Sequence, residues 1–342
     1  MATKQGKQTY LLDHPPAITG FAAIGSKKEG EGPLGQYFDI INFDSTFSQK
    51  SWEKAESQMV HDTVELAVKK AGLSYQDIDC IFTGDLLNQC IASTFGIREL
   101  GIPYLGIYGA CSTMAEGLML AAFLADGGGM RNIIASTGSH FCTAERQYRF
   151  PLEYGGQRPP TSQWTVTGSG AAIVTAEPAA GPRIRAVTVG TIEDKGIKDA
   201  ANMGAAMAPA AAATIQQFFA DTGTGPEEYD LILTGDLGQV GSDLLYELLL
   251  RENIDIREKH TDCGLLIYDR DKQDVHAGAS GCGCCASVLC SYILPAVQAG
   301  RLRRLLFIAT GALLSPTSTQ QGESIPSVAH LVYITADPAQ EV

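Results

Sequence analysis

Cys111 is the residue whose surroundings most clearly indicate chemistry. It follows an apolar segment and two small residues, Gly109 and Ala110, and an apolar stretch comes after it. A strand that ends in a tight turn, with a helix beginning at the cysteine, would expose the thiol to free N–H groups and the positive end of the helix dipole. Both favour the thiolate. We therefore predict a functional thiol at Cys111; the alternative is a buried, inert cysteine.

Two aspartates, Asp85 and Asp236, also follow short apolar segments. In an open α/β sheet, ligands bind at the carboxyl ends of the strands, so both carboxylates could line a site. Each could instead cap the next helix. We predict a site role for Asp85, because its strand should lie beside the one that leads to Cys111. For Asp236 capping is at least as good an explanation.

Two histidines and one long segment complete the candidate groups. His140 follows a third apolar segment and His330 begins the penultimate predicted strand; each is either a functional group or a structural hydrogen-bonding residue. Residues 141–168 are predicted to be a long loop, rich in aromatic residues and arginine. Long loops in compact domains are usually functional or disordered, and this composition favours a lid or a subunit contact. Its arginines Arg146 and Arg149 could bind a carboxylate.

A short run of cysteines, Cys282-Gly-Cys-Cys285, invites a metal interpretation. One Cys-x-x-Cys without a second pair is weak evidence for a metal site. Because apolar residues follow, we interpret these thiols as packing residues at a helix start and predict no metal. P-loop, G-x-G-x-x-G, H-E-x-x-H and G-x-S-x-G patterns are absent from the sequence.

The elements that would position these groups occur twice. The pattern Asp-x-Ile-x-Thr-Gly-Asp-Leu begins at Asp79 and again at Asp230, and three further pairs of segments match in the same order at offsets of about 150–175 residues. We infer two copies of one β-α-β-α-β-α-β-β unit, spanning 1–178 and 179–342 and joined by the Pro/Gly-rich link Glu177–Pro182.

The hydrophobic pattern places the elements of each copy. In the first copy we predict helices at 52–71, near 88–100 and at 112–126, and strands at 17–24, 79–84, 103–108, 131–137 and 170–176. In the second copy we predict helices at 208–221, 240–252 and 284–299, and strands at 183–192, 230–235, 263–268 with 273–277, 304–310 and 328–336. Continuous apolar strands predict sheets that are covered on both faces.

Composition excludes several classes of protein. The 342 residues include 25 Lys and Arg against 38 Asp and Glu, a formal charge of −13. This balance argues against a nucleic-acid partner, which needs a basic surface. The sequence has no signal-peptide pattern and no apolar run of about 18 residues, so we expect a soluble protein. Nine cysteines, an odd number, favour free thiols in a reducing compartment.

A duplicated unit with a cysteine at a strand-to-helix turn resembles the thiolase and ketoacyl-synthase superfamily, over nearly the whole chain. The resemblance implies a layered α-β-α-β-α sandwich and, in the enzymes, acylation of the cysteine with help from a histidine and an asparagine of the second copy. Here Asp236 stands where the ketoacyl synthase III pattern has the histidine, and Ala279 replaces the asparagine. Loss of one oxyanion donor costs roughly 100–1000-fold in rate. We therefore expect a retained pocket without efficient condensation.

Within this superfamily, residues 138–168, Thr83–Gln89 and Tyr108–Gly117 resemble the stage V sporulation protein AD family of spore-forming bacteria. The resemblance implies a non-catalytic protein that binds pyridine-2,6-dicarboxylic acid (dipicolinic acid). Asp85 and Cys111 are the matching pocket positions. Further candidate contacts are His140, Arg146, Arg149, Ser280 and His330.

The same resemblance implies a place in the cell. The protein would act with membrane proteins of the same operon, peripherally at the forespore or spore inner membrane, in uptake of the acid and its release at germination. No cofactor is expected, although calcium could accompany the acid, since Asp85 would repel a free dianion. A homodimer is expected through the strand near 131–137. The alternative function is an acyltransferase that uses CoA thioesters, with Cys111 as the acylated nucleophile and His140 or His330 as base.

Overall fold

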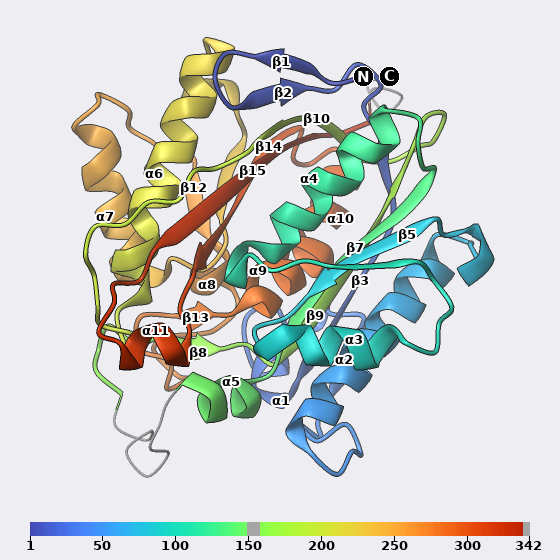
Figure 1. The fold of residues 1–342 in the computed structure, drawn as a ribbon. Helices are drawn as coiled ribbons and strands as arrows, with labels where there is room; N and C mark the ends of the chain where they lie inside the picture. The colour runs from blue at the N-terminus through green and yellow to red at the C-terminus, as the bar shows by residue number, and fades with distance from the viewer. Residues whose placement is uncertain (149–157, 338–342) are drawn as a thin grey trace.

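The two halves of the chain contribute five strands each, in the same order and with the same relative directions. A computed structural model describes residues 1–148 and 158–337 (Figure 1). In the first half the neighbours are β6 (Tyr104–Gly106), β5 (Cys80–Gly84), β7 (Asn132–Ser139), β9 (Gly168–Thr175) and β3 (Ala17–Ser26). In the second half they are β12 (His260–Asp262), β11 (Leu231–Thr234), β14 (Arg304–Ala312), β15 (Ser327–Thr335) and β10 (Arg183–Thr188). In both, the fourth strand (β9 or β15) runs antiparallel to the other four, which share one direction. The predicted duplication is therefore visible in the topology.

The two five-stranded units meet where β3 lies beside β10, at the pair Ala17 and Arg183. An N-terminal hairpin that the hydrophobic pattern did not predict, β1 (Thr3–Gln5) and β2 (Thr9–Leu11), also pairs with β10. Short strands complete the pairing: β4 (Ile40–Asn42) beside β3, and β8 (Trp164–Thr165) beside β13 (Ala279–Ser280). The β8–β13 pair connects the two halves of the chain close to Ser280.

Helices form three layers around the strands (Figure 1). The outer layers are α2 (Trp52–Lys70) with α3 (Ile91–Ile97), and α6 (Met203–Thr222) with α7 (Gly238–Leu250). The middle layer holds α4 (Thr113–Asp126) and the continuous segment α9 (Cys282–Val288), the π-helix Leu289–Ile293 and α10 (Leu294–Gln298). The remaining short helices are α1 (Lys27–Gly30), α5 (Phe141–Tyr148), α8 (Cys263–Leu266) and α11 (Pro316–Gln320). The order is α-β-α-β-α, as expected.

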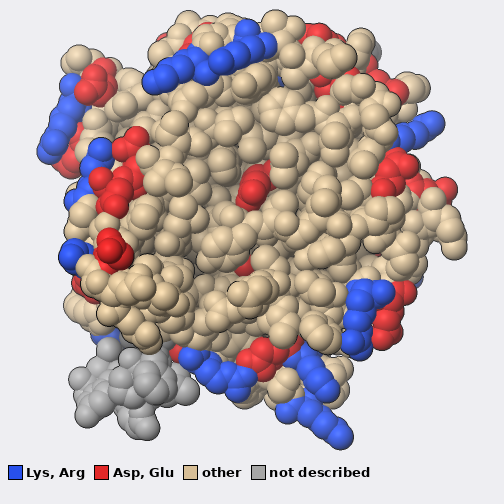
Figure 2. Space-filling view, in the orientation of Figure 1, with Lys and Arg blue, Asp and Glu red and all other residues tan. Residues whose placement is uncertain are grey.

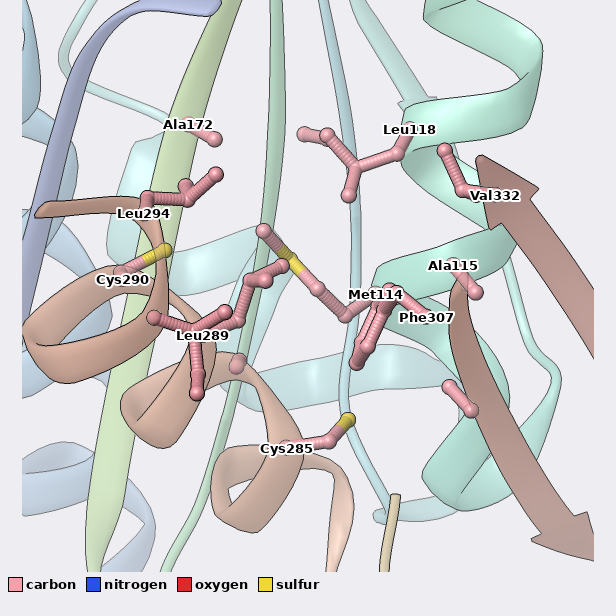
Figure 3. Close-up of a cluster of buried hydrophobic side chains, with 14 of the residues drawn as sticks. Met114, Ala115, Leu118, Ala172, Cys285, Leu289, Cys290, Leu294, Phe307 and Val332 are labelled. Carbon is pink, nitrogen blue, oxygen red and sulfur yellow. The ribbon is translucent and has the colours of Figure 1, made fainter. Parts of the chain in front are cut away.

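The core lies in the middle layer, where the two copies of the unit face each other (Figure 3). Met114 and Leu118 of α4 face Leu289 and Leu294, and Phe307 of β14 closes the cluster; all five side chains are buried. Burial of one such side chain contributes roughly 1.5–3 kcal/mol. None of the helices among the described residues is both long enough and apolar enough to span a lipid bilayer.

Two predicted elements of the second half are wrong. Residues 263–268 were expected to be a strand, but the strand is β12, which ends at Asp262, and the chain then turns into α8. The Asp262 carboxylate accepts a hydrogen bond from the Gly264 N–H at 3.0 Å, the N-cap contact that starts a helix. Residues 273–277 form no strand either.

The predicted lid, residues 141–168, also needs correction. It begins with α5 and ends in β8, so it is not a continuous loop. Residues 149–157, including the candidate Arg149, lie outside the described residues. The ring of Phe141 on α5 stacks on that of Trp164 on β8, with centroids 3.8 Å apart, which holds the two described ends of the segment together.

The strand expected to form a dimer interface lies inside the sheet. β7 is paired with β5 on one side and with β9 on the other, so neither of its edges is free for a second copy. The outer strand of this half is β6, which pairs with β5 alone and whose three residues are exposed. If a second copy pairs with this sheet, β6 is the strand that can accept it.

Candidate functional site

Cys111 lies in a single 3-10 turn, Ala110–Ser112, between β6 and α4. Two hydrogen bonds to backbone carbonyls fix this turn: the Ser112 hydroxyl donates to Gly109 and the Thr113 hydroxyl donates to Ala110, each at 2.7 Å. Gly311 of β14 lies so close that a Cβ there would meet the Gly109 oxygen at 2.0 Å. The second half of the chain thus packs directly on the turn that carries the thiol.

A pocket of about 390 Å³ opens above this turn, within the size range of small-molecule sites. Both halves line it, together with one face of α5. Its lining residues are Leu86, Tyr108, Ala110, Cys111, Ala144, Glu145, Tyr148, Ser162, Gln163, Thr165, Asp199, Ala200, Ala201, Met203, Ser280, Ala312 and Leu314. Of the predicted contacts, the structure therefore brings Cys111 and Ser280 into one pocket.

The buried carboxylate of Asp236 lies close enough to the Cys111 thiol for its charge to act on it. The same carboxylate accepts from the Gly281 N–H at 2.9 Å and from the hydroxyls of Ser280 and Thr310, each at 3.1 Å. These three donors occupy most of the acceptor capacity of one carboxylate. Asp236 is thus the residue around which the floor of the pocket is built, and the prediction that it caps a helix is wrong.

The electrostatics oppose a thiolate at Cys111. Burial raises the pKa of the thiol well above its usual value, and the nearby Asp236 charge raises it further. Burial also raises the pKa of Asp236, to about 6, so this group remains a hydrogen-bond acceptor at neutral pH. The expected thiolate is therefore contradicted, because the helix start does not offset the burial and the adjacent anion. The cap of α7 is supplied instead by Asp262, which accepts from the N–H groups of Leu237 and Gly238 at 2.9 Å.

Asp85 accepts hydrogen bonds from backbone N–H groups, as in the capping role that was the predicted alternative to a site role. It is fully buried and accepts from the Leu87 N–H at 2.9 Å and the Ser93 N–H at 2.7 Å, which shapes the segment leading into α3. It is not one of the residues that line the pocket. Asp85 therefore supports the wall that contains Leu86 and does not itself face the cavity.

The remaining predicted contacts also lie outside the described lining. His140 uses both ring nitrogens: Nδ1 accepts from the Cys142 N–H at 3.1 Å, and Nε2 is 2.8 Å from the Ser45 carbonyl oxygen. Burial lowers the pKa of His140, and it lowers that of His330 to about 4. Arg146 forms an ion pair with Glu53 of α2. Neither histidine is among the described residues that line the pocket with Cys111.

Several lining residues carried no signal in the sequence. Gln163 donates through Nε2 to the carbonyl oxygens of Asp236 and Ala279, each at 2.7 Å, and so connects β8 to the floor of the pocket. Tyr148 of α5 donates to the Leu86 carbonyl at 2.5 Å. The segment 199–203 supplies the opposite wall. Only Tyr108, near Cys111 in sequence, could have been proposed beforehand.

The cysteine run at the start of α9 packs as predicted. The thiols of Cys282 and Cys285 donate to the carbonyl oxygens of Gly138 and Cys111, at 3.0 and 3.4 Å. Within residues 1–148 and 158–337, the one group of potential metal ligands is His61, Asp62 and Glu65 on α2, with ligand atoms within 4.8 Å of one another. None of these three lines the pocket.

Five layers with a cysteine turn between the sheets define a thiolase-like protein. Solved structures agree: 3-oxoacyl-[acyl-carrier-protein] synthase III from Aquifex aeolicus VF5 covers 94% of this chain and 99% of its own, with 14% identity and a TM-score of 0.56. Cerulenin-bound OleA from Xanthomonas campestris covers 94% and 96%, with 15% identity and a TM-score of 0.60. At such identities the likeness shows the fold alone.

The family is shown by sequence. The family model for stage V sporulation protein AD matches residues 6–335. The stage V sporulation protein AD of Bacillus subtilis (strain 168) is 47% identical over 325 residues, which cover 95% of this chain and 96% of that protein. The chain belongs to the stage V sporulation protein AD family.

Proposed function

We propose that this sporulation protein binds dipicolinic acid without transforming it, in uptake of the acid into the developing spore and its release at germination. The observation that carries the proposal is a buried Cys111 thiol that lines the pocket beside the Asp236 carboxylate. A thiol that burial and a neighbouring carboxylate keep neutral is a poor nucleophile. The pocket of the thiolase-like fold is thus retained, while its chemistry is suppressed.

The lining suits an aromatic ring that carries polar substituents. Apolar side chains such as Leu86, Met203 and Leu314 alternate with the hydroxyl groups of Tyr108 and Thr165. Small-molecule pockets typically combine apolar walls with a few polar groups that fix orientation. A flat pyridine ring would lie against the apolar walls, and its carboxyl oxygens would accept from the hydroxyls.

The charge of the pocket supports binding of the acid together with calcium. Among the described residues, the lining includes the carboxyl groups of Glu145 and Asp199 and no lysine or arginine. A free dianion would meet like charges there, whereas a calcium chelate is neutral, and oxygen ligands are those that calcium prefers. We therefore propose that calcium enhances binding.

Calorimetric titration of dipicolinate, with and without calcium, tests this proposal. We expect saturable binding to the wild type, tighter with calcium, and binding about fivefold weaker in Cys111→Ala, because removal of the lining sulfur atom leaves a gap about the size of a methyl group, which costs about 1 kcal/mol. Cys142→Ala, the same substitution outside the pocket, should bind like the wild type. The acyltransferase alternative predicts instead a covalent adduct on Cys111 after incubation with acyl-CoA, visible by intact mass. An adduct without dipicolinate binding would refute the proposal.

The role of Asp85 is tested by the same titration. We propose that Asp85→Ala weakens binding indirectly, because Asp85 holds the segment that places Leu86 in the pocket wall. Unchanged affinity of Asp85→Ala, with and without calcium, would exclude any role for this residue in binding.

We further propose that the protein works at the forespore or spore inner membrane, peripherally, with membrane proteins of the same operon. The support for this is membership of the stage V sporulation protein AD family. Crosslinking in sporulating cells, followed by mass spectrometry of the crosslinked partners, tests it. Crosslinks confined to soluble proteins would contradict it.

A homodimer through β6 is the last part of the proposal. On the face of the molecule shown in Figure 2, most Lys, Arg, Asp and Glu side chains lie near the edge and few lie in the middle. Tyr104 and Leu105 of β6 are exposed, as are Ile91 and Phe95 of α3, and the Tyr104 hydroxyl contacts the Thr94 hydroxyl of α3 at 3.2 Å. Pairing of two β6 strands would cover these side chains.

We expect the wild type to be a dimer by light scattering and Leu105→Asp to be a monomer, because the charge would be buried unpaired against the partner. Leu244→Asp places the same charge at an exposed leucine of α7 and should remain dimeric. A wild type that is monomeric at all concentrations would contradict this interface.

A further inference from the structure

Glu56 is a buried carboxyl group that no sequence pattern marked. It lies on α2 and has no exposed surface. Its neighbour is Thr143 of α5, the short helix whose residues Ala144, Glu145 and Tyr148 form one wall of the pocket. Glu56 thus connects an outer helix to the wall of the ligand site.

The hydrogen-bond geometry indicates which of the two groups donates. Thr143 Oγ1 lies 2.6 Å from Glu56 Oε2 and 2.8 Å from the His140 carbonyl oxygen. The hydroxyl has one proton, and the peptide carbonyl can only accept it. The contact with Glu56 is therefore best satisfied when Glu56 is protonated and donates to Thr143. Glu56 Oε1, which has no hydrogen-bond partner among the described residues, is then an uncharged carbonyl oxygen.

The charged groups around Glu56 favour the same state. Burial raises the pKa of Glu56 well above its usual value, and the charge of Asp85 raises it further. Cys282 of α9 also faces this region, and burial keeps its thiol neutral by raising its pKa. Burial likewise lowers the pKa of His140, so it supplies no cation. On α2, Glu53 is already paired with Arg146. Among residues 1–148 and 158–337, none of the neighbours named above therefore compensates a second buried anion beside Asp85.

We propose that Glu56 is a positioning residue that acts as a neutral carboxylic acid and holds α5 against the pocket, so that ionisation of Glu56 releases α5 and weakens ligand binding. The effect on the ligand rests on the proposed function. The protonation state does not, because it concerns the protein alone. Glu56 is not one of the residues that line the pocket.

The sign of the pH effect follows from the raised pKa. A carboxyl group that is neutral in the folded state and ionised in the unfolded state stabilises the fold fully at low pH. This contribution is lost as the pH rises through the folded pKa. Dipicolinate carboxyls ionise well below neutral pH, so the ligand's own titration does not interfere between neutral and alkaline pH.

Dipicolinate titrations with calcium, from neutral to alkaline pH, form the test. We expect the affinity of the wild type to fall by about fivefold or more as the pH rises, within the usual range of coupling. Glu56→Gln should keep the neutral-pH affinity and lose this decline, because the amide can still donate to Thr143 and cannot ionise. Glu65→Gln, the same substitution at an exposed position of α2, should retain the decline.

Two measurements on the ligand-free protein separate this inference from the proposed function. The infrared band of a protonated carboxyl group should be present at neutral pH in the wild type and weaker in Glu56→Gln. The melting temperature of the wild type should fall more steeply with pH than that of Glu56→Gln. If the wild type shows both signals but does not bind dipicolinate, only the proposed identity of the ligand is refuted. An unchanged infrared band and pH profile in Glu56→Gln would overturn the role of Glu56. If Glu56→Gln does not fold, Thr143→Ala, which removes the acceptor, must show the lowered affinity at neutral pH.

Discussion

Asp236→Asn is expected to make Cys111 react with iodoacetamide about tenfold faster or more at neutral pH. In the wild type the buried thiol lies beside the Asp236 carboxylate, and this charge opposes the thiolate. Two unit charges about 4 Å apart interact with about 4 kcal/mol at an effective dielectric of about 20, close to three units of pKa. Burial of the thiol persists in the variant, so we expect only part of this difference to appear.

The asparagine is expected to be accommodated. The hydroxyls of Ser280 and Thr310, which donate to Asp236 in the wild type, can rotate and accept from the new amide instead. We expect a loss of stability of about 1–2 kcal/mol, typical of one disturbed buried hydrogen bond. The Gly281 N–H still meets the amide oxygen.

Mass spectrometry of the alkylated peptides gives the rate at each cysteine separately. Ser280→Ala is the matched control: it removes one donor to Asp236 and keeps the charge, so Cys111 should stay as slow as in the wild type. A Cys111 that reacts equally fast in the wild type and in Asp236→Asn would show that the carboxylate does not suppress the thiol. The proposal that Asp236 suppresses the reactivity of the Cys111 thiol would then be refuted.

The sequence was sufficient for the fold and for the position of the thiol. Both depend on local patterns: the repeat that begins at Asp79 and at Asp230 predicts two equal units, and small residues before Cys111 predict a turn. The strand order confirmed the duplication, and the 3-10 turn at Ala110–Ser112 confirmed the position of the cysteine. Local signals of this kind survive tertiary packing because they are properties of the backbone.

The roles of the two aspartates could not be predicted, because each follows the same pattern. Asp85 turns back to the N–H groups of its own loop, while Asp236 points across to Gly281 and Cys111. The difference arises from Asp262, which already supplies the cap of α7 and leaves Asp236 without that role. Asp262 lies 26 residues further along the chain, directly before residues 263–268, which were wrongly predicted to be a strand.

The protonation states of the side chains could not be predicted from the sequence either. The helix start predicts a thiolate at Cys111, yet the thiol is buried beside an anion that comes from the other half of the chain. Glu56 is one acidic residue among several on α2, and only the packing of α5 on α2 shows that it is buried. Long-range contacts therefore decide the chemistry of this site, and local patterns decide its scaffold.

Phe307→Ala is expected to lower the free energy of unfolding by about 3–5 kcal/mol, the usual cost of removing a fully buried phenylalanine. Phe307 is on β14, and its side chain lies against the middle layer, beside Met114 of α4 (Figure 3). Deletion of the ring leaves a cavity between the two copies of the unit, and the fully packed neighbours can close it only in part. The loss should therefore appear as lowered stability of the whole protein.

Urea unfolding at equilibrium measures this effect, with Phe43→Ala as the matched control, since the Phe43 side chain is 71% exposed. The control should change stability by less than about 0.5 kcal/mol. The cavity also lies next to α4, which begins just after the Cys111 turn, so Phe307→Ala should weaken dipicolinate binding even at temperatures where the variant is folded. A Phe307→Ala protein with unchanged stability would contradict the central core between the halves. One that is destabilised but binds normally would show that the cysteine turn is held by its own hydrogen bonds and by Gly311, independently of the packing behind it.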